Sequence, residues 1–271
     1  MTPKFIQPIK QTELQNVLND IAHFFTTRQL SLAPEKCEQL TICKKSAPFD
    51  VYLENTLLKK ATAVKDLGIH ISSDLTWKLQ VNTISRKAFQ RSYHIMKSFS
   101  TKNIWTLLKA YKTFVRPILE YGSSVWNPHL IADIDKIESV QRNFTKKICF
   151  RSSIPFSSYK DRLKKLSLHS LEYRRLQNDL IMVYKIIHRL VDLPFESLFS
   201  FYISPYDTRS HRYCLKSNLI KDLKLRNFFS KKVIPTWNDL PKEIVYTNNL
   251  SSFCKKLKQF DLYEINKTLR F

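Results

Sequence analysis

Glycine is almost absent from this chain: its 271 residues include only Gly68 and Gly122. Loops that hold phosphate groups against the backbone need several closely spaced glycines, so the P-loop and dinucleotide-binding classes are excluded. Ser123 and Ser124 follow Gly122 directly, but a nucleophile elbow of the G-x-S-x-G type needs a second glycine there. The shortage of glycine therefore argues against all three kinds of site: the P-loop, the dinucleotide-binding loop and the nucleophile elbow.

Paired carboxylates are also missing, because no two aspartates are adjacent anywhere in the sequence. A two-metal phosphoryl-transfer site needs carboxylates that converge on ions about 4 Å apart. Asp133 and Asp135 come nearest, yet residues two apart point away from each other on a helix. Asp135 and Glu138 instead suit a helix start, where negative charge is favourable. The histidines show no H-E-x-x-H spacing, so we predict no catalytic residue and no metal site.

The five cysteines show no C-x-x-C spacing and their number is odd, which favours free thiols in a reducing compartment. They are Cys37, Cys43, Cys149, Cys214 and Cys254. No apolar run approaches the ~20 residues that span a bilayer. The N-terminus lacks the apolar segment of a signal peptide. We therefore expect a soluble intracellular protein, in either the nucleus or the cytoplasm.

Positive charge is the abundant feature, with 45 Lys and Arg against 23 Asp and Glu and a net charge of +22. The excess lies mainly in residues 81–190, which hold 21 basic and 7 acidic side chains, against 10 and 8 in residues 1–80. Such an excess predicts a polyanionic partner. An anionic membrane surface is the second choice; the predicted partner is nucleic acid, and no membrane association is expected.

Ten basic residues in this middle region are the candidate phosphate contacts, although any one cluster could equally be a solvated helix face. They are Arg142, Lys146, Lys147, Arg151, Lys160, Arg162, Lys164, Lys165, Arg174 and Arg175. No aromatic side chains alternate with them as in single-strand binding surfaces. We therefore expect contact with the backbone of a duplex, independent of base sequence.

Hydrophobic periodicity predicts an α+β fold that is mainly α. Residues 11–25 form a helix in which Thr12 and Gln15 make a capping box at its start. A small antiparallel sheet follows up to residue 72, with a hairpin turn at Glu54–Asn55 and a strand that contains Gly68. Helical stripes then occupy 77–99, 104–115, 134–148 and 171–190, with shorter helices near 228–233 and 253–260 and an irregular stretch at 200–217. Pro117 ends or kinks the second stripe.

The apolar face of the first helix is predicted to be Leu14, Val17, Leu18, Ile21, Phe24 and Phe25. Five aromatic residues lie within apolar patterns and are predicted to be in the core: Trp105, Tyr111, Tyr121, Trp126 and Trp237. Gly122 has two possible structural roles. It either ends a helix in the left-handed conformation or allows a neighbouring helix to approach closely.

Several segments resemble one family in the same order. The stretch YKTFVRPILEYGSSVWNPH and the following DIDKIESVQRNFTKKI are similar to the region after the polymerase core in jockey-type non-LTR retrotransposon reverse transcriptases. KDLGIHISSDLTW upstream and IPTWNDLPKEIV downstream extend the resemblance from about residue 12 to residue 260. Its landmark residues are Gly68, Pro117, Tyr121, Gly122, Trp126, Trp237, Asn238 and Pro241.

The resemblance implies part of an RNA-directed DNA polymerase, a nucleotidyltransferase. It implies the end of a palm at 1–75, a helical thumb at 76–150 and a post-polymerase region at 151–271. The family's paired aspartates and their Mg²⁺ belong to an upstream part of the palm, and residues 1–13 do not contain that motif. This chain alone is therefore expected to bind a template–primer duplex without catalysis or cofactor.

Two alternatives remain at this stage. The first is a non-catalytic relic with a structural role, in contact with other retroelement proteins or with none. The second is a nuclease-class enzyme built from scattered carboxylates, namely Asp133, Asp135, Asp161 and Asp179.

Overall fold

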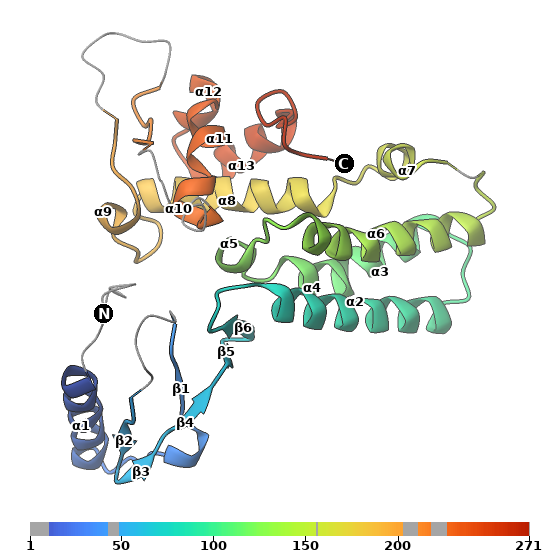
Figure 1. The fold of residues 1–271 in the computed structure, drawn as a ribbon. Helices are drawn as coiled ribbons and strands as arrows, with labels where there is room; N and C mark the ends of the chain where they lie inside the picture. Colours follow the sequence, from blue (N-terminus) through green and yellow to red (C-terminus); the bar gives the residue numbers. More distant parts are fainter. Residues whose placement is uncertain (1–10, 43–48, 156, 203–210, 218–226, 271) are drawn as a thin grey trace. The chain divides into compact units, whose positions relative to one another are not determined.

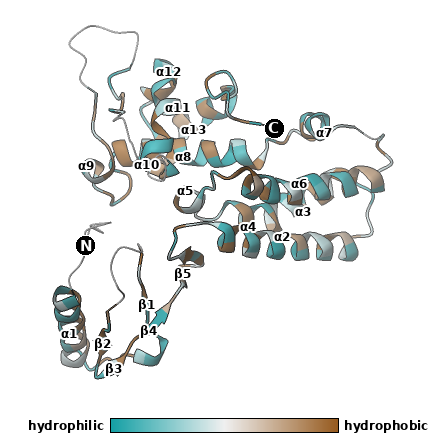
Figure 2. Cartoon of the chain, viewed as in Figure 1, coloured by the Kyte–Doolittle hydropathy of each residue, from teal (hydrophilic) through white to brown (hydrophobic). Residues whose placement is uncertain are grey.

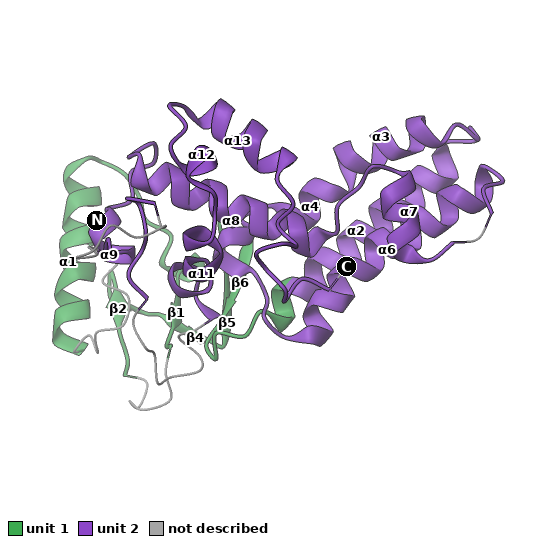
Figure 3. Ribbon diagram, turned by 90° about the horizontal axis from the view of Figure 1, so that it is seen from above, with its two compact units in different colours: residues 1–80 green, residues 81–271 purple. Residues whose placement is uncertain are grey.

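A computed structural model describes residues 11–42, 49–155, 157–202, 211–217 and 227–270. The chain forms two compact units, Met1–Gln80 and Val81–Phe271 (Figure 3). The mainly helical α+β class is confirmed (Figure 1). The predicted palm, thumb and post-polymerase segments at 1–75, 76–150 and 151–271 rest on the resemblance and stay predictions beside this division into two units.

Among its described residues, the first unit contains one long helix, a 3₁₀ turn and six short strands. They are α1 (Gln11–Thr27), η1 (Pro34–Lys36), β1 (Glu38–Leu40), β2 (Tyr52–Leu53), β3 (Thr56–Leu57), β4 (Lys59–Ala61), β5 (Ala63–Asp66) and β6 (Ile69–Ser72). The strands form three separate pairs. Pairs β2–β3 and β5–β6 are antiparallel as predicted, whereas β1 and β4 are parallel.

Two tight turns connect the antiparallel pairs. The predicted turn at Glu54–Asn55 is confirmed, with φ values of 48° and 65°. The prediction of a single strand through Gly68 is wrong, because Leu67 (φ 43°) and Gly68 (φ 88°) form the turn between β5 and β6. Two consecutive residues with positive φ are typical of two-residue hairpins, and glycine adopts this conformation without a steric penalty.

The core of the first unit is small. Val51, Leu53 and Leu58 are buried, and Leu14 and Leu18 of α1 pack against them. The capping-box prediction is wrong: α1 already includes position 12, and the Gln15 side chain bonds elsewhere. Its Nε2 donates to the Tyr52 carbonyl (2.8 Å) and its Oε1 accepts from the Tyr52 amide (2.9 Å). These bonds tie α1 to β2.

Half of the predicted apolar face of α1 is exposed to solvent. Val17, Ile21 and Phe24 are 45%, 40% and 48% exposed. Leu14 and Leu18 lie on the side of α1 that contacts β2. Val17, Ile21 and Phe24 lie next to this side and are not part of the core. Periodicity correctly identified an apolar surface, but the described residues of this unit cover only part of it.

The second unit contains twelve helices among its described residues. They are α2 (Lys78–Ser98), α3 (Ile104–Phe114), α4 (Arg116–Glu120), α5 (Ser123–Trp126), α6 (Ile131–Arg151), α7 (Tyr159–Lys165), α8 (Leu171–Ile187), α9 (Phe195–Leu198), α10 (Phe229–Lys232), α11 (Ile234–Asn238), α12 (Lys242–Val245) and α13 (Leu250–Gln259). Hydrophilic and hydrophobic residues alternate along α2 and α6 (Figure 2), as expected for helices with one buried face. In the irregular stretch, an isolated bridge joins Phe201 to Leu215.

The central helical stripes are largely confirmed. Val81, Ile84, Ala88 and Ile95 of α2 are buried, as are Leu107, Leu108 and Tyr111 of α3 and Ile137, Val140, Phe144 and Ile148 of α6. Among the five aromatic residues predicted to be in the core, Tyr111, Trp126 and Trp237 are buried. The prediction is wrong for Trp105 and Tyr121, which are 59% and 61% exposed. Trp105 lies on the opposite face of α3 from Leu107 and Tyr111.

Gly122 forms the joint between two short helices. Helix α3 ends at Phe114, and Pro117 lies in the first turn of α4, where a missing amide proton costs nothing. Gly122 then has φ 62° and ψ 22°, which confirms the left-handed alternative. Trp126 follows in α5, where its Nε1 donates to the Tyr121 carbonyl (2.7 Å). Gly122 thus supplies the left-handed residue between α4 and α5, and Trp126 of α5 is buried in the core.

We expect Gly122→Val to lower the free energy of unfolding by about 1–2 kcal/mol, because a Cβ atom is disfavoured in the left-handed region. Gly122→Asn is the matched control, since asparagine tolerates this conformation and should cost less. Urea denaturation of the three proteins measures the difference. Equal stability of the valine variant and the wild type would contradict this role.

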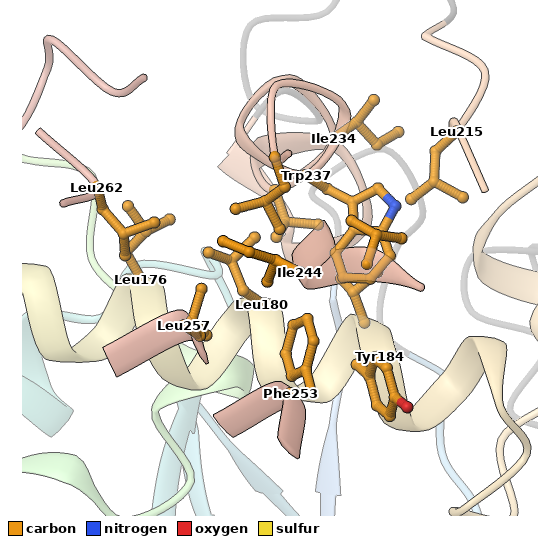
Figure 4. Close-up of a cluster of buried hydrophobic side chains, with 14 of the residues drawn as sticks. Leu176, Leu180, Tyr184, Leu215, Ile234, Trp237, Ile244, Phe253, Leu257 and Leu262 are labelled. Carbon is orange, nitrogen blue, oxygen red and sulfur yellow. The ribbon is translucent and has the colours of Figure 1, made fainter. Parts of the chain in front are cut away.

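A second core lies along α8, beneath the C-terminal helices (Figure 4). Leu180 and Tyr184 of α8 meet Trp237 of α11 and Phe253 of α13, and the rings of Tyr184 and Phe253 stack at 4.3 Å. The landmark residues around Trp237 have structural roles. Asn238 donates to and accepts from the backbone of Leu215 (2.9 and 2.8 Å), and Pro241 precedes the first turn of α12.

Candidate nucleic-acid interface

Five of the ten predicted phosphate contacts are exposed lysines on α6 and α7. They are Lys146, Lys147, Lys160, Lys164 and Lys165. Within the part of the chain that the structure describes, none of them is in an ion pair. Their positive field acts on Asp161. The pKa of that carboxyl is lowered first by a hydrogen bond with Ser158 and then by Lys165 and Lys164. We call these five residues the lysine surface.

Arg151 and Arg162 have structural contacts instead. The guanidinium of Arg151 donates to the carbonyls of Met96 (2.6 Å) and Phe99 (2.5 Å), at the end of α2. Arg162 is only 6% exposed and donates to the Ser157 carbonyl (2.6 Å). Arg142 is half-buried, 3.8 Å from Asp135 and above the Tyr159 ring. Arg151 and Arg162 thus hold the end of α6 and the start of α7 in place.

Arg174 and Arg175 require a correction, because α8 places them against other helices. Arg174 forms a two-pronged ion pair with Glu120 of α4, with 2.9 Å between Nη2 and Oε2. Arg175 is fully buried, and its Nε donates to Asn127 Oδ1 (3.2 Å). A buried guanidinium does not reach a phosphate, so Arg162 and Arg175 are left out of the proposed interface. The charge pattern alone did not distinguish the inner face of α8 from its outer face.

Asn127 links Arg175 to a buried acid. Its Nδ2 donates to Asp179 Oδ2 at 2.7 Å, while its Oδ1 accepts from Arg175. Burial raises the pKa of Asp179 to about 6, against the lowering effect of Asn127 and Lys232. Burial also lowers the pKa of Lys232. The carboxylate of Asp179 therefore lies near the positive charges of Arg175 and Lys232, in the interior between α5, α8 and α10.

A second buried network lies beneath the lysine surface, and sequence reasoning missed it. Glu138 is fully buried; its Oε2 accepts from the Leu171 amide (3.0 Å) at the start of α8, and its Oε1 accepts from the Tyr159 hydroxyl. Gln141 donates to Tyr159 (3.0 Å) and accepts from the Tyr111 hydroxyl (3.0 Å). These bonds link α3, α6, α7 and α8.

Glu138 therefore differs from its predicted role. It stabilises the start of α8 rather than the start of its own helix, which begins at Ile131. Burial raises the pKa of this carboxyl, while Tyr159 and Arg175 lower it. The signal in the sequence was a glutamate within an apolar helical stripe, three residues before Gln141. Sequence spacing does not show which distant amide such a side chain reaches.

Sequence reasoning also missed Phe150. Its side chain is 87% exposed, and it follows Lys146 by four residues and Lys147 by three. These intervals place the three residues on one face of α6. An exposed aromatic ring therefore lies beside two lysines of the lysine surface.

The carboxylates of the nuclease alternative have separate partners. Asp135 lies beside Arg142, Asp161 is hydrogen-bonded to Ser158, and Asp179 is bonded to Asn127. No group of three His, Cys, Asp or Glu side chains suited to a metal ion occurs among the residues that the structure describes. The convergence that would support a nuclease is therefore not observed there.

Among the described helices, none is both long enough and apolar enough to cross a membrane.

No established family profile matches the chain, and no solved structure is significantly similar to it. Sequence similarity extends to an uncharacterised Caenorhabditis elegans protein, with 26% identity over 113 residues. It also extends to a Drosophila melanogaster protein described as a probable RNA-directed DNA polymerase from transposon X-element, with 24% identity over 139 residues. The chain is a distant, partial relative of a transposon polymerase.

The similarity covers 42% and 48% of this chain, respectively. It spans 57% of the nematode protein and 15% of the transposon polymerase, less than two thirds of either relative. The similarity thus supports a distant relationship to a retroelement polymerase over about half of this chain.

Proposed function

We propose that this chain is a thumb-like, nucleic-acid-binding part of a jockey-type non-LTR retrotransposon polymerase. Its α6–α7 region would hold the phosphate backbone of a template–primer duplex. The observation that carries the proposal is the lysine surface: five exposed ammonium groups on two helices, none in an ion pair among the described residues. The distant relationship to a transposon polymerase supports the ligand class.

Rigid positioning of this surface supports backbone binding. Arg151 holds the end of α6 against α2, and Tyr159 holds the start of α7 against Glu138 of α6. Lysines that project from fixed helices keep a constant spacing, which suits the regular phosphates of a duplex. Because lysine contacts with phosphate read no base, the proposed binding is independent of sequence.

The test is the salt dependence of binding to a short RNA–DNA duplex, measured by fluorescence anisotropy. Each phosphate that is neutralised contributes about −0.9 to the log–log slope, so Lys146→Ala/Lys147→Ala should reduce its magnitude by about 1.8. Between about 50 and 200 mM salt the wild type should therefore lose about tenfold more affinity than the variant. The loss should be uniform across duplex sequences.

A matched control is available on α13, where Lys255 and Lys258 are also exposed. Lys255→Ala/Lys258→Ala removes the same charge from a helix outside the proposed interface. The proposal expects the control to keep most of the wild-type slope. If the two double variants behave alike, the effect reflects only net charge and the lysine surface is not the interface.

A structural role among retroelement proteins is the second candidate. The exposed Val17, Ile21 and Phe24 on α1 favour it, because a surface of large apolar side chains is typical of protein contacts. Failure of the wild type to bind any duplex at low salt would support this candidate over the first.

A further inference from the structure

Helix α3 presents a tryptophan to solvent in a fixed position. Trp105 is 59% exposed, while Leu107 and Tyr111 on the other side of the helix are fully buried. Asn103 caps the helix, since its Oδ1 accepts from the Trp105 amide (2.9 Å) and the Thr106 amide (3.2 Å). The turn that carries the indole is therefore anchored by the cap on one side and the core on the other.

Lysines continue the same face of α3. Lys109 and Lys112 follow Trp105 by four and seven residues, the intervals that place side chains along one side of a helix. Lys109 is exposed and Lys112 is half-buried. At about 1.5 Å per residue, the row from Trp105 to Lys112 extends over about 10 Å. This corresponds to about three nucleotides at the ~3.4 Å spacing of a stacked strand.

An excess of positive charge lies at the end of this row. Arg116 and Arg174 both face Glu120: Arg174 by the two-pronged ion pair, and Arg116 with its Nε 3.8 Å from Oε1. The pKa of Lys112 is lowered, first by partial burial and then by repulsion from Arg116 and Arg174. Glu120 faces two arginines, and Lys112 nearby is repelled by both of them, so an added anion would be stabilised here.

We propose that Trp105, Lys109, Lys112 and Arg116 form a binding site for unpaired nucleotides of a single-stranded RNA or DNA. A base stacks on the Trp105 indole, and the adjoining phosphates contact the cations toward the end of α3 and the start of α4. The site shares its ligand class with the proposed function but uses different helices and a different feature of the ligand. Tryptophan provides a face for any base, so the site is tolerant of sequence.

The test is a titration with a short single-stranded oligonucleotide, followed by tryptophan fluorescence and by anisotropy. Trp126 and Trp237 are fully buried and Trp77 is half-buried, so the titration is made in a Trp77→Phe background, where Trp105 should account for most of the quenching. Trp105→Leu should weaken single-strand binding by about 5- to 150-fold and remove most of the quenching. Trp105→Phe, which keeps an aromatic face, should retain part of the affinity. Lys109→Ala/Lys112→Ala should reduce the salt slope.

Duplex binding separates this site from the lysine surface. Trp105→Leu should leave duplex affinity unchanged, because paired bases are not available to the indole. Lys146→Ala/Lys147→Ala should weaken duplex binding without removing the Trp105 quenching. If Trp105→Leu binds the single strand as tightly as the wild type, or if saturation leaves wild-type fluorescence unchanged, the α3 site is refuted whatever the duplex result. If the wild type binds the single strand but binds no duplex, only the α6–α7 interface is refuted.

Discussion

Arg175→Met is expected to destabilise the protein by about 3–5 kcal/mol at pH 7. Arg175 is fully buried, and its charge attracts the carboxylates of Glu138, Glu172 and Asp179. Methionine fills a similar volume but removes the cation that stabilises the buried Glu138 carboxylate, and it leaves Asp179 with Lys232 alone as its counter-charge. Removal of one member of a buried charge network leaves the others desolvated and unpaired, which is the costly outcome.

The double variant Arg175→Met/Asp179→Asn tests this explanation. Asparagine carries no charge, so the second change should restore part of the stability that the first removes. Urea denaturation of the wild type, both single variants and the double variant gives the coupling energy. The measurement belongs at pH 7, above the Asp179 pKa of about 6, where the carboxyl is mostly ionised. Additive losses would show that the two charges do not compensate each other.

Unfolding of Trp237→Ala should require about 3–5 kcal/mol less free energy than unfolding of the wild type. The indole is fully buried in the core along α8, 6.0 Å from the ring of Phe253. Its Nε1 also donates to the Tyr213 carbonyl (2.9 Å). Alanine leaves a cavity between α11 and α13 and removes the hydrogen-bond donor for the Tyr213 carbonyl. The lost apolar burial and the lost hydrogen bond both lower the free energy of unfolding.

Trp237→Phe separates the contribution of apolar burial from that of the hydrogen bond, because phenylalanine keeps most of the apolar volume and lacks the N–H group. It should cost about 1–2 kcal/mol, the loss of one hydrogen bond and a smaller ring. Thermal and urea denaturation of both variants measure the difference. A Trp237→Ala protein as stable as the wild type would contradict the central position of this residue in the C-terminal core.

Much of the helical architecture could be predicted from the sequence. The stripes of α2, α3, α6 and α8 repeat at helical spacing, and Val81, Leu107, Ile137 and Leu180 are buried as expected. The break between helices at Pro117–Gly122 could be predicted, because proline interrupts a helix and glycine adopts a positive φ. Such features depend on a few neighbouring residues. The turn at Leu67–Gly68 was missed, because β5 and β6 together resemble one continuous strand.

The candidate sites were less predictable. The charge pattern located the basic region but treated Lys146 and Arg175 alike, although one is exposed and the other is fully buried. Trp105 was predicted to be core because it lies in an apolar pattern, yet its face of α3 meets solvent. Whether a side chain on a helix is covered depends on the neighbouring helices, which come from distant parts of the sequence.

By itself, the sequence determined the mainly helical class, the basic middle region, the helix joint at Gly122 and the likeness to a retrotransposon polymerase. Composition, periodicity and local turn chemistry act over short stretches, so they can be read without coordinates. Only the tertiary structure decided that Glu138 stabilises the start of α8, that Arg175 and Asp179 meet through Asn127, and that Trp105 faces solvent. These pairings join residues about 30 to 50 positions apart, and local preference carries no information at that range.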